Sequence, residues 1–365
     1  MIIITVLLLI LPIYSSASDD PLLDPFPSLR HGVGARGLSM GGTGVVTSSG
    51  AEAILWNPAL IVSGERMDFI FFGNQVNSTN LSGIPSQQRV FTGATFKIDD
   101  REWFIFERPV IGAALYYYNI TGLSVIGVDP VTANPLSTAY NDEGWNDLLM
   151  IVPFAADIPY SERRLSIGIN FLAHQHSMFV QSSELSYGWD WGAKLRIMGE
   201  TNPTGIDSRK RYSSKLFVLL GARLRHLEGI KWKPANSPVA YTQNEWNYLD
   251  FGISMGSNLL KSPWLSGFTS ALQLRFDENS DYHISVGGEI AAQNVRVRMG
   301  ADNILSSYAD DNRANSALTF GLGLLGFESM KIVKGLYLDY CFRMYLGAAN
   351  TWLEDENSIS VGYTF

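Results

Sequence analysis

The last eight residues of the chain, SISVGYTF at positions 358–365, alternate between small or polar side chains and large apolar ones. Because a β-strand points successive side chains to opposite faces, Ile359, Val361, Tyr363 and Phe365 would form one apolar face. Strands that meet lipid on one side and a wet lumen on the other have this pattern in transmembrane β-barrels. An edge strand of a soluble sheet can alternate in the same way, so the rest of the chain has to decide.

The same alternation recurs along the chain and is clearest at residues 216–225, 268–277 and 336–344. Further strands are expected to start near Met67, Val90, Val110, Leu148, Leu165, Leu185, Leu249, Tyr282, Val295 and Leu318. With the terminal strand the count is about 14, an even number as in bacterial single-chain barrels. We therefore predict an all-β fold, a transmembrane antiparallel β-barrel formed by residues 65–365.

The longest loops are expected at residues 121–145, 199–214 and 226–246, which are rich in Pro, Asn, Gly and charge. Counting connections in pairs from the N-terminus predicts that all three lie on the outer side. Four tryptophans are expected at strand ends, where an indole can bury its ring and keep its N–H in water: Trp145, Trp246, Trp264 and Trp352.

The N-terminus has the features of an export leader. Residues 2–14 are almost wholly apolar but too short to span a membrane, and small residues follow up to Ala17. We expect a signal peptide over residues 1–17, cleaved after Ala17. No Lys or Arg precedes the apolar run, so an uncleaved anchor or a misplaced start codon remains an alternative. No later segment is an apolar stretch of helical-span length.

Composition agrees with an exported barrel. Charged residues make up 17% and aromatic residues 12%, with 34 glycines and 9 tryptophans. The net charge of −8 argues against nucleic acid as a partner, because a phosphate-binding surface needs excess Lys and Arg. The single cysteine, Cys341, permits no internal disulfide.

Residues 36–59 do not alternate, and their glycines predict tight turns rather than a strand. Residues 51–56 are expected to form a short helix that stops before Pro58. Pro58 fixes the backbone and Asn57 can bond nearby main chain, so this corner is expected to hold the segment in position.

This segment also carries a resemblance. The run ARGLSMGGTGVVTSSGAEAILWNPAL, residues 35–60, resembles the N-terminal plug of FadL-like outer-membrane proteins, and most of all their PorV/PorQ branch, where Met-Gly-Gly and Trp-Asn-Pro-Ala recur. The resemblance implies that residues 18–64 form a small hatch inside the barrel. Its hatch residues would be Gly41, Gly42, Gly44, Trp56, Asn57, Pro58 and Ala59. Residues 48–50 are Ser-Ser-Gly where many relatives carry an acidic pair.

The resemblance implies a function and partners. It favours passive transport of hydrophobic compounds, such as long-chain fatty acids, across the cell outer membrane. The alternative is a PorV-like, non-enzymatic secretion component or scaffold that binds partners through its loops. A general porin is a third possibility, but a hatch would obstruct its pore. The expected partners are outer-membrane lipid, a hydrophobic small molecule or secretion partner, and the barrel assembly machinery. The Tyr-x-Phe terminus resembles the assembly signal read by that machinery, here Val361, Tyr363 and Phe365.

Strand parity predicts a cluster of charged side chains in the lumen. Its members are Arg196, Arg223, Arg225, Asp250, Arg275, Glu289, Arg296, Arg298, Asp339 and Arg343, with Lys194 and Asp190 beside them. One interpretation is a site for an anionic head group, since Arg presents a planar fork to carboxylate. The favoured interpretation is a salt-bridge network that fixes the hatch inside the barrel.

Two other patterns are typical of ligand sites, but their sequence context favours a structural role. Residues 32–37, GVGARG, match a dinucleotide fingerprint, but no core strand precedes them, so flexible hatch turns are favoured. His174 and His176 share a strand face, yet two imidazoles without a third ligand are weak evidence for a metal, and a polar strand end facing the lumen or solvent is favoured. We predict no metal, no cofactor and no enzymatic activity. A lipid hydrolase is the enzyme alternative, because a triad is spatial and sequence alone does not exclude it.

Overall fold

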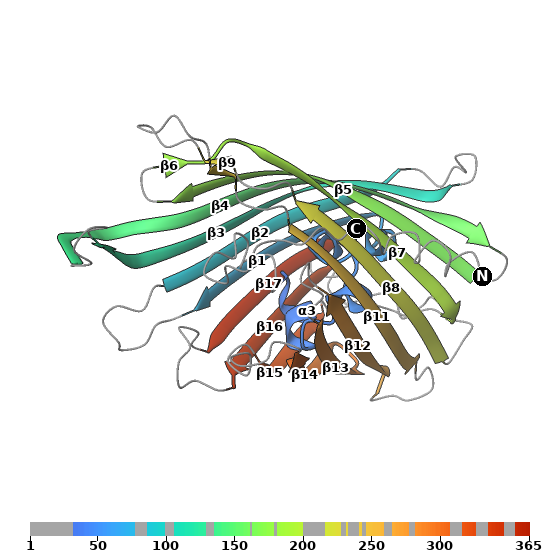
Figure 1. The fold of residues 1–365 in the computed structure, drawn as a ribbon. Helices are drawn as coiled ribbons and strands as arrows, with labels where there is room; N and C mark the ends of the chain where they lie inside the picture. Colours follow the sequence, from blue (N-terminus) through green and yellow to red (C-terminus); the bar gives the residue numbers. More distant parts are fainter. Residues whose placement is uncertain are drawn as a thin grey trace.

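The computed structural model describes residues 32–76, 86–98, 106–128, 135–160, 163–178, 181–199, 216–227, 231–232, 241–242, 246–258, 265–276, 282–306, 316–325, 335–346 and 355–365. Within these ranges, fourteen long antiparallel strands form one sheet that closes on itself where β4 pairs with β5 (Figure 1). The predicted leader, residues 1–17, lies outside the described residues.

The long strands are β1 Met67–Val76, β2 Ser86–Lys97, β3 Glu107–Val128, β4 Pro135–Tyr160, β5 Arg163–Met178, β7 Ser186–Met198, β8 Leu216–Leu227, β11 Trp246–Asn258, β12 Gly267–Phe276, β13 Tyr282–Ala292, β14 Val295–Ser306, β15 Ala317–Leu325, β16 Leu336–Tyr345 and β17 Glu356–Thr364. Three two-residue strands accompany them: β6 Gln181–Ser182, β9 Lys231–Trp232 and β10 Tyr241–Thr242. The predicted barrel of about fourteen strands is confirmed.

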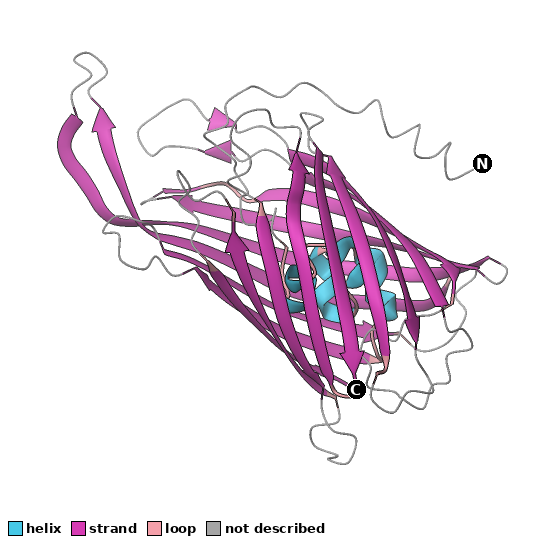
Figure 2. Ribbon diagram, turned by 90° about the horizontal axis from the view of Figure 1, so that it is seen from below, coloured by secondary structure: helices cyan, strands magenta, loops and turns pink. Residues whose placement is uncertain are grey.

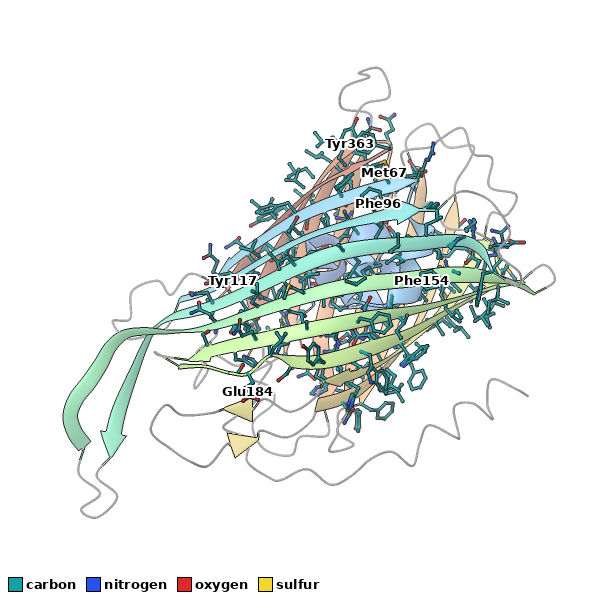
Figure 3. The ribbon with its side chains drawn as sticks, turned by 90° about the horizontal axis from the view of Figure 1, so that it is seen from above. Met67, Phe96, Tyr117, Phe154, Glu184 and Tyr363 are labelled. Carbon is teal, nitrogen blue, oxygen red and sulfur yellow. The ribbon has the colours of Figure 1, made fainter. Side chains whose placement is uncertain are left out.

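Each strand alternates between the lumen and the exterior. In β17, the even-numbered residues are buried, while Ile359 is 51% exposed and Phe365 just beyond the strand is 63% exposed. Figure 3 shows the side chains along the strands and places Met67 and Phe96 near one end of the barrel and Tyr117 toward the other. Large apolar side chains such as Phe171 and Met299 are exposed around the barrel. Exposed apolar side chains on alternate positions of the strands are typical of barrels that face lipid.

The first and last strands of the chain meet at a seam. β1 pairs with β17 over nine residue pairs, from Asp68 opposite Thr364 to Val76 opposite Glu356. The aromatic rings at the C-terminus pack across it, since Phe365 contacts Tyr363 with ring centroids 4.5 Å apart and Phe69 with centroids 6.1 Å apart. Val361 is also exposed on the outer face. The residues of the predicted assembly signal therefore lie together on the exterior beside this seam.

The β3–β4 hairpin extends beyond its neighbours. Past Thr121, which pairs with Ser86 of β2, and Trp145, which pairs with Met178 of β5, these two strands pair only with each other (Figures 1 and 2). The predicted loop at residues 121–145 is therefore wrong for residues 121–128 and 135–145, which lie in strands. Residues 129–134 are not described. Pairs such as Ile126 with Ala139 continue the ladder, and shifts in register accommodate the irregular sequence.

The predicted placement of the three loops at one end is also wrong. Each antiparallel strand reverses the chain, so connections alternate between the two ends of the barrel. β7 and β8 are the sixth and seventh long strands, so the connection between them lies at the end where β1 begins. The β3–β4 and β8–β11 connections lie at the opposite end.

Of the four tryptophans, Trp246 begins β11 as expected, Trp145 lies within β4, and Trp264 and Trp352 are outside the described residues.

The lumen holds four short helices that precede β1: α3 Ala35–Ser39, α4 Gly44–Thr47, and the 3₁₀ helices η2 Gly50–Leu55 and η3 Pro58–Ser63 (Figure 2). Almost every residue in them is buried. No helix among the described residues is long and apolar enough to cross a membrane. We call residues 32–64 the hatch. The helix predicted at 51–56 corresponds to η2, which ends before Pro58.

Candidate functional site

The hatch is built around one tryptophan. Trp56 is 1% exposed, and its indole Nε1 donates a hydrogen bond to the carbonyl of Val33. Its ring occupies the space that side chains would need at three glycines, because a Cβ at Gly32, Gly37 or Gly44 would lie 2.0–2.9 Å from it. The glycines read from the sequence as turns therefore have a second use here, which is to make room for the indole.

Gly41 and Gly42 form the turn between α3 and α4. Both have positive φ angles, 68° and 77°, which glycine adopts without steric cost. Gly41 also touches the wall directly, since its added Cβ would lie 2.2 Å from the carbonyl oxygen of Val286 in β13. Its backbone N–H donates to Thr319 Oγ1 of β15 at 3.0 Å. The turn is fixed to the wall by backbone contact as well as by a hydrogen bond.

Asn57 connects the two halves of the hatch to each other and to the wall. Its Nδ2 donates to the carbonyl of Val45 at 2.9 Å and to that of Ala193 in β7 at 3.1 Å. Its Oδ1 accepts a bond from the N–H of Ala59 at 3.0 Å and so caps η3, with Pro58 at the first helical position. The predicted corner is thus a junction with three side-chain hydrogen bonds.

The hatch rests on pairs of wall glycines that face each other across neighbouring strands. The pairs are Gly168 with Gly192, Gly221 with Gly252, and Gly287 with Gly300. A Cβ on any of these six would lie 2.1–2.6 Å from a hatch atom. The atoms met belong to the Asn57–Pro58 corner, to Val45 and to the Met40–Gly41 turn. The wall is therefore shaped to the hatch at three places around the ring.

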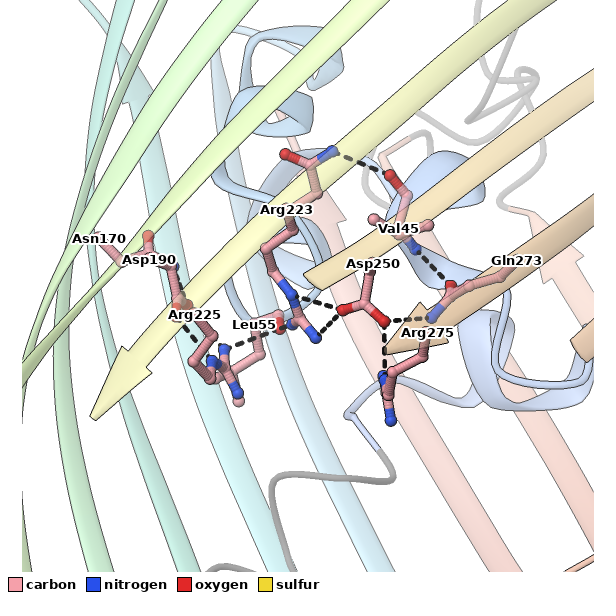
Figure 4. Close-up of polar contacts among 10 residues, drawn as sticks. Val45, Leu55, Asn170, Asp190, Arg223, Arg225, Asp250, Gln273 and Arg275 are labelled. Carbon is pink, nitrogen blue, oxygen red and sulfur yellow. Dashed lines mark hydrogen bonds and ion pairs between the residues drawn. The ribbon is translucent and has the colours of Figure 1, made fainter. Parts of the chain in front are cut away.

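One ion-pair group lies beside the end of η2 (Figure 4). Arg225 forms a bidentate pair with Asp190, with both N–O distances 2.7 Å. Arg223 and Arg275 share Asp250, the first through its Nε at 2.9 Å and the second through its Nε at 2.7 Å. The guanidinium groups of Arg223 and Arg225 also donate to the carbonyl of Leu55 in the hatch. This carbonyl ends a helix and has no further turn to bond to, so the wall arginines satisfy it.

A second ion-pair group surrounds Glu289 of β13. Arg36 of the hatch reaches its carboxylate at 3.2 Å, and Arg296 and Arg298 of β14 reach it at 2.7 and 2.6 Å. Arg298 also pairs with Asp339 of β16 at 2.6 Å. One carboxylate thus holds three guanidinium groups, one of which comes from the hatch. All of these side chains are buried, and buried charges of this kind need such partners.

The remaining members of the predicted lumen cluster have other partners. Arg343 pairs with Asp302. Lys194 donates to Ser63 Oγ at the end of the hatch at 2.6 Å, while Arg196 is half-buried in β7 opposite Leu219. These contacts fit the salt-bridge interpretation better than a head-group site, because the guanidinium groups already face carboxylates and hatch carbonyls.

Several charged residues of the site were not predicted. They are Arg36, Glu52, Arg89, Asp302 and Glu356, the last of which pairs with Arg89. Parity offered a signal for Glu356, since extending the alternation of the last strand by one step places it on the polar face with Ser358.

Glu52 is an acidic residue within the hatch itself. Its carboxylate accepts a bond from the N–H of Gly37 at 2.9 Å. Burial raises the pKa of Glu52 to about 7, and Arg36 nearby offsets part of that rise. Glu52 lines a cavity of about 30 Å³ between the hatch and the wall, with Asp68 of β1 and Tyr337 of β16 also on its border. A space of this size holds about one water molecule.

Comparison with known proteins agrees with this architecture. No family model matches the chain, and no curated protein sequence matches it. Among solved structures, the chain is similar to a TodX deltaS2S3 mutant monoaromatic hydrocarbon channel, at 12% identity and a TM-score of 0.54, covering 92% of this chain and 99% of that one. The Pseudomonas putida toluene transporter TodX gives 11% identity and a TM-score of 0.49, covering 91% and 97%. A Pseudomonas aeruginosa FadL homologue gives 10% and 0.46, covering 91% and 98%.

At these identities the shared property is the fold. The chain is a closed fourteen-stranded antiparallel β-barrel with an N-terminal plug in its lumen. The resemblance to the PorV/PorQ branch stays a prediction.

Proposed function

We propose that the protein lies in the cell outer membrane and lets hydrophobic compounds cross it passively. The observation that carries the proposal is the hatch: a buried plug, tied to the wall by glycine seats and ion pairs, inside a barrel whose exterior is apolar. A barrel built to pass ions or sugars freely would have an open aqueous lumen. The similarity in fold to a monoaromatic hydrocarbon channel also supports the proposed passage of hydrophobic compounds.

In this proposal the hatch separates the two ends of the lumen. A hydrophobic compound would enter from the outer end and leave through the wall or past a shifted hatch, driven by its concentration gradient. Long-chain fatty acids are one substrate class, and smaller hydrocarbons are another. The hatch contacts three pairs of wall glycines and forms an ion pair through Arg36. A shift of the hatch therefore requires the loss of these specific contacts rather than a general loosening.

The test uses the Asn57 corner. Replacing both Asn57 and Pro58 by Ala removes three side-chain hydrogen bonds and the fixed backbone, while leaving every strand unchanged. Uptake of a labelled fatty acid and of toluene would be measured in cells that lack their own channel. We expect uptake to change while the heat-resistant gel mobility of the barrel persists. Unchanged uptake of both compounds at normal protein levels would contradict the transport proposal.

A second candidate function is favoured by the β3–β4 hairpin. Its two strands extend past the neighbouring ones and pair only with each other, which offers a surface beyond the barrel for a protein partner. In that case the barrel is a scaffold that serves secretion, and the hatch is filling. Deleting residues 122–144 would then lower export of the partner and leave hydrophobic uptake unchanged.

A further inference from the structure

Three buried side chains with metal-binding chemistry converge on the lumen side of β4 and β5. They are Asp147, His174 and His176, and their ligand atoms all lie within 4.8 Å of one another. The two imidazole rings meet edge to face with centroids 3.9 Å apart, and His176 Nδ1 contacts Asp147 Oδ1. None of the three side chains is more than 3% exposed. The sequence showed only the two histidines, which is why a metal was not predicted.

The strand register explains how the third ligand arrives. His174 and His176 are two residues apart on one strand, so they point to the same face. Asp147 lies directly opposite His176 in the β4–β5 ladder, which brings its carboxylate to the same side. The backbone at this point is held as well, since Ser183 and His176 exchange hydrogen bonds of 2.8 and 2.9 Å. Three ligands on adjacent, braced strands form a site with little freedom to rearrange.

The donor set favours a transition-metal cation. Two imidazoles and one carboxylate suit zinc and similar divalent ions, whereas calcium and magnesium prefer oxygen ligands alone. Donor atoms about 3.4 Å apart surround a tetrahedral zinc with bonds of about 2.0–2.1 Å. The ligand atoms here all lie within 4.8 Å of one another, which is close to that spacing. A hydrogen-bonded Asp–His pair alone would not require a second imidazole packed against it.

The location suggests what such an ion would do. Trp145 and Met178 form the last pair of the β4–β5 ladder, and beyond it β4 continues only with β3. Asp147 and His176 lie two residues from that point. We propose that Asp147, His174 and His176 bind one first-row divalent cation, which braces the base of the β3–β4 hairpin against the barrel wall. The site is separate from the hatch and does not depend on the transport proposal.

The test uses the full chain, purified in detergent with a tag that contains no histidine and treated with a chelator. Zinc would be titrated calorimetrically, and cobalt would be added separately, because bound Co²⁺ gives a visible absorption band that reports tetrahedral or five-coordinate geometry. We expect one equivalent of zinc and a cobalt band that zinc displaces. Asp147→Asn keeps the shape of the side chain but removes its charge, and should weaken zinc binding at least tenfold. His174→Gln combined with His176→Gln should abolish it.

Two histidines elsewhere in the wall provide matched controls. His226 and His283 each bond an asparagine, Asn247 at 2.7 Å and Asn303 at 2.9 Å, and no acidic residue joins them in a metal-type cluster among the described residues. His226→Gln and His283→Gln should bind zinc as the unchanged chain does. Stoichiometric zinc in the double His174/His176 variant would overturn the proposal. So would the absence of both zinc heat and a cobalt band in the unchanged chain, an outcome that does not require any variant to fold.

Discussion

Arg36 in the hatch and Glu289 in β13 form a buried ion pair of 3.2 Å between residues 253 positions apart in the chain. Glu289 also forms ion pairs within the wall, because Arg296 and Arg298 of the next strand contact the same carboxylate. The pair therefore links the hatch to the barrel wall, and the loss of Arg36 should have a different effect from the loss of Glu289.

Replacing Arg36 by Gln should loosen the hatch and leave the wall intact, because Glu289 keeps two arginines. Replacing Glu289 by Gln leaves three guanidinium groups without their shared carboxylate and should destabilise the protein by about 3–5 kcal/mol. Urea unfolding in detergent measures the second effect, and single-channel conductance in planar bilayers measures the first. Equal loss of stability in the two variants would contradict the division between hatch and wall.

Neighbouring glycines in β13 offer a sharper test of the hatch seat. A Cβ at Gly287 would lie 2.1 Å from the carbonyl oxygen of Met40, whereas one at Gly288 would meet only Thr269, at 3.7 Å. Gly287→Ala should displace the hatch and cost about 1–3 kcal/mol by overpacking. Gly288→Ala should stay within about 0.5 kcal/mol of the unchanged chain. Protease cleavage within residues 32–64 reports the displacement. Similar cleavage in both variants would mean that the seat does not position the hatch.

Glu52 predicts how the hatch responds to pH. Because burial raises its pKa from 4.5 to about 7, the folded state binds the proton more tightly than the unfolded state. Its contribution to stability is fully present below about pH 4.5 and is lost as pH rises to about 7, by up to about 3 kcal/mol. The charged groups that influence it include Arg36, Arg298 and Asp339, and the carboxylate of Asp68 lines the same cavity.

Hydrogen exchange of the hatch amides should therefore be slower at pH 5 than at pH 7.5, after correction for the intrinsic pH dependence of exchange. Glu52→Gln keeps an acceptor for the Gly37 N–H and should remove that difference. A variant that keeps the full difference would assign the pH response to another group.

The C-terminal ring cluster predicts an assembly defect. Phe365 packs against Tyr363 and Phe69 on the exterior, so its deletion removes both the terminal aromatic and a contact across the seam. Levels in the outer-membrane fraction should fall severalfold. Thr364→Ser, which keeps a hydroxyl at a buried lumen position, should leave the levels unchanged. Equal levels in both variants would remove Phe365 from the assembly signal.

The strands were predictable because lipid and lumen impose opposite demands on alternate residues. In β8, Leu220 and Leu224 lie on the partly exposed face while Arg223 and Arg225 are buried, and parity predicted the inward direction of both arginines. The β3–β4 extension was not predictable in the same way. Its sequence contains Gly, Asn and Pro that usually end strands, and the pairing of two strands with each other overrides that preference.

The sequence also did not predict which charged residues of the lumen pair with each other. Parity indicates which side chains face inward, but pairing depends on register and on where the hatch lies. Arg36 carries no sign of its contact with Glu289, and Asp147 carries none of its contact with His176, because each contact joins elements whose alignment the sequence does not state.

The hatch contacts both strands of the seam. The N–H of Ala51 donates to Asp68 of β1 at 3.1 Å, and the N–H of Ala35 donates to Ser360 of β17 at 2.7 Å. β1 and β17 are the first and last of the described strands in chain order, so they pair only when the ring is completed. Because the hatch bonds to both strands, we expect the seating of the hatch and the closure of the ring to occur together during folding. An incompletely folded chain would then have both an open sheet and a hatch outside its place in the lumen.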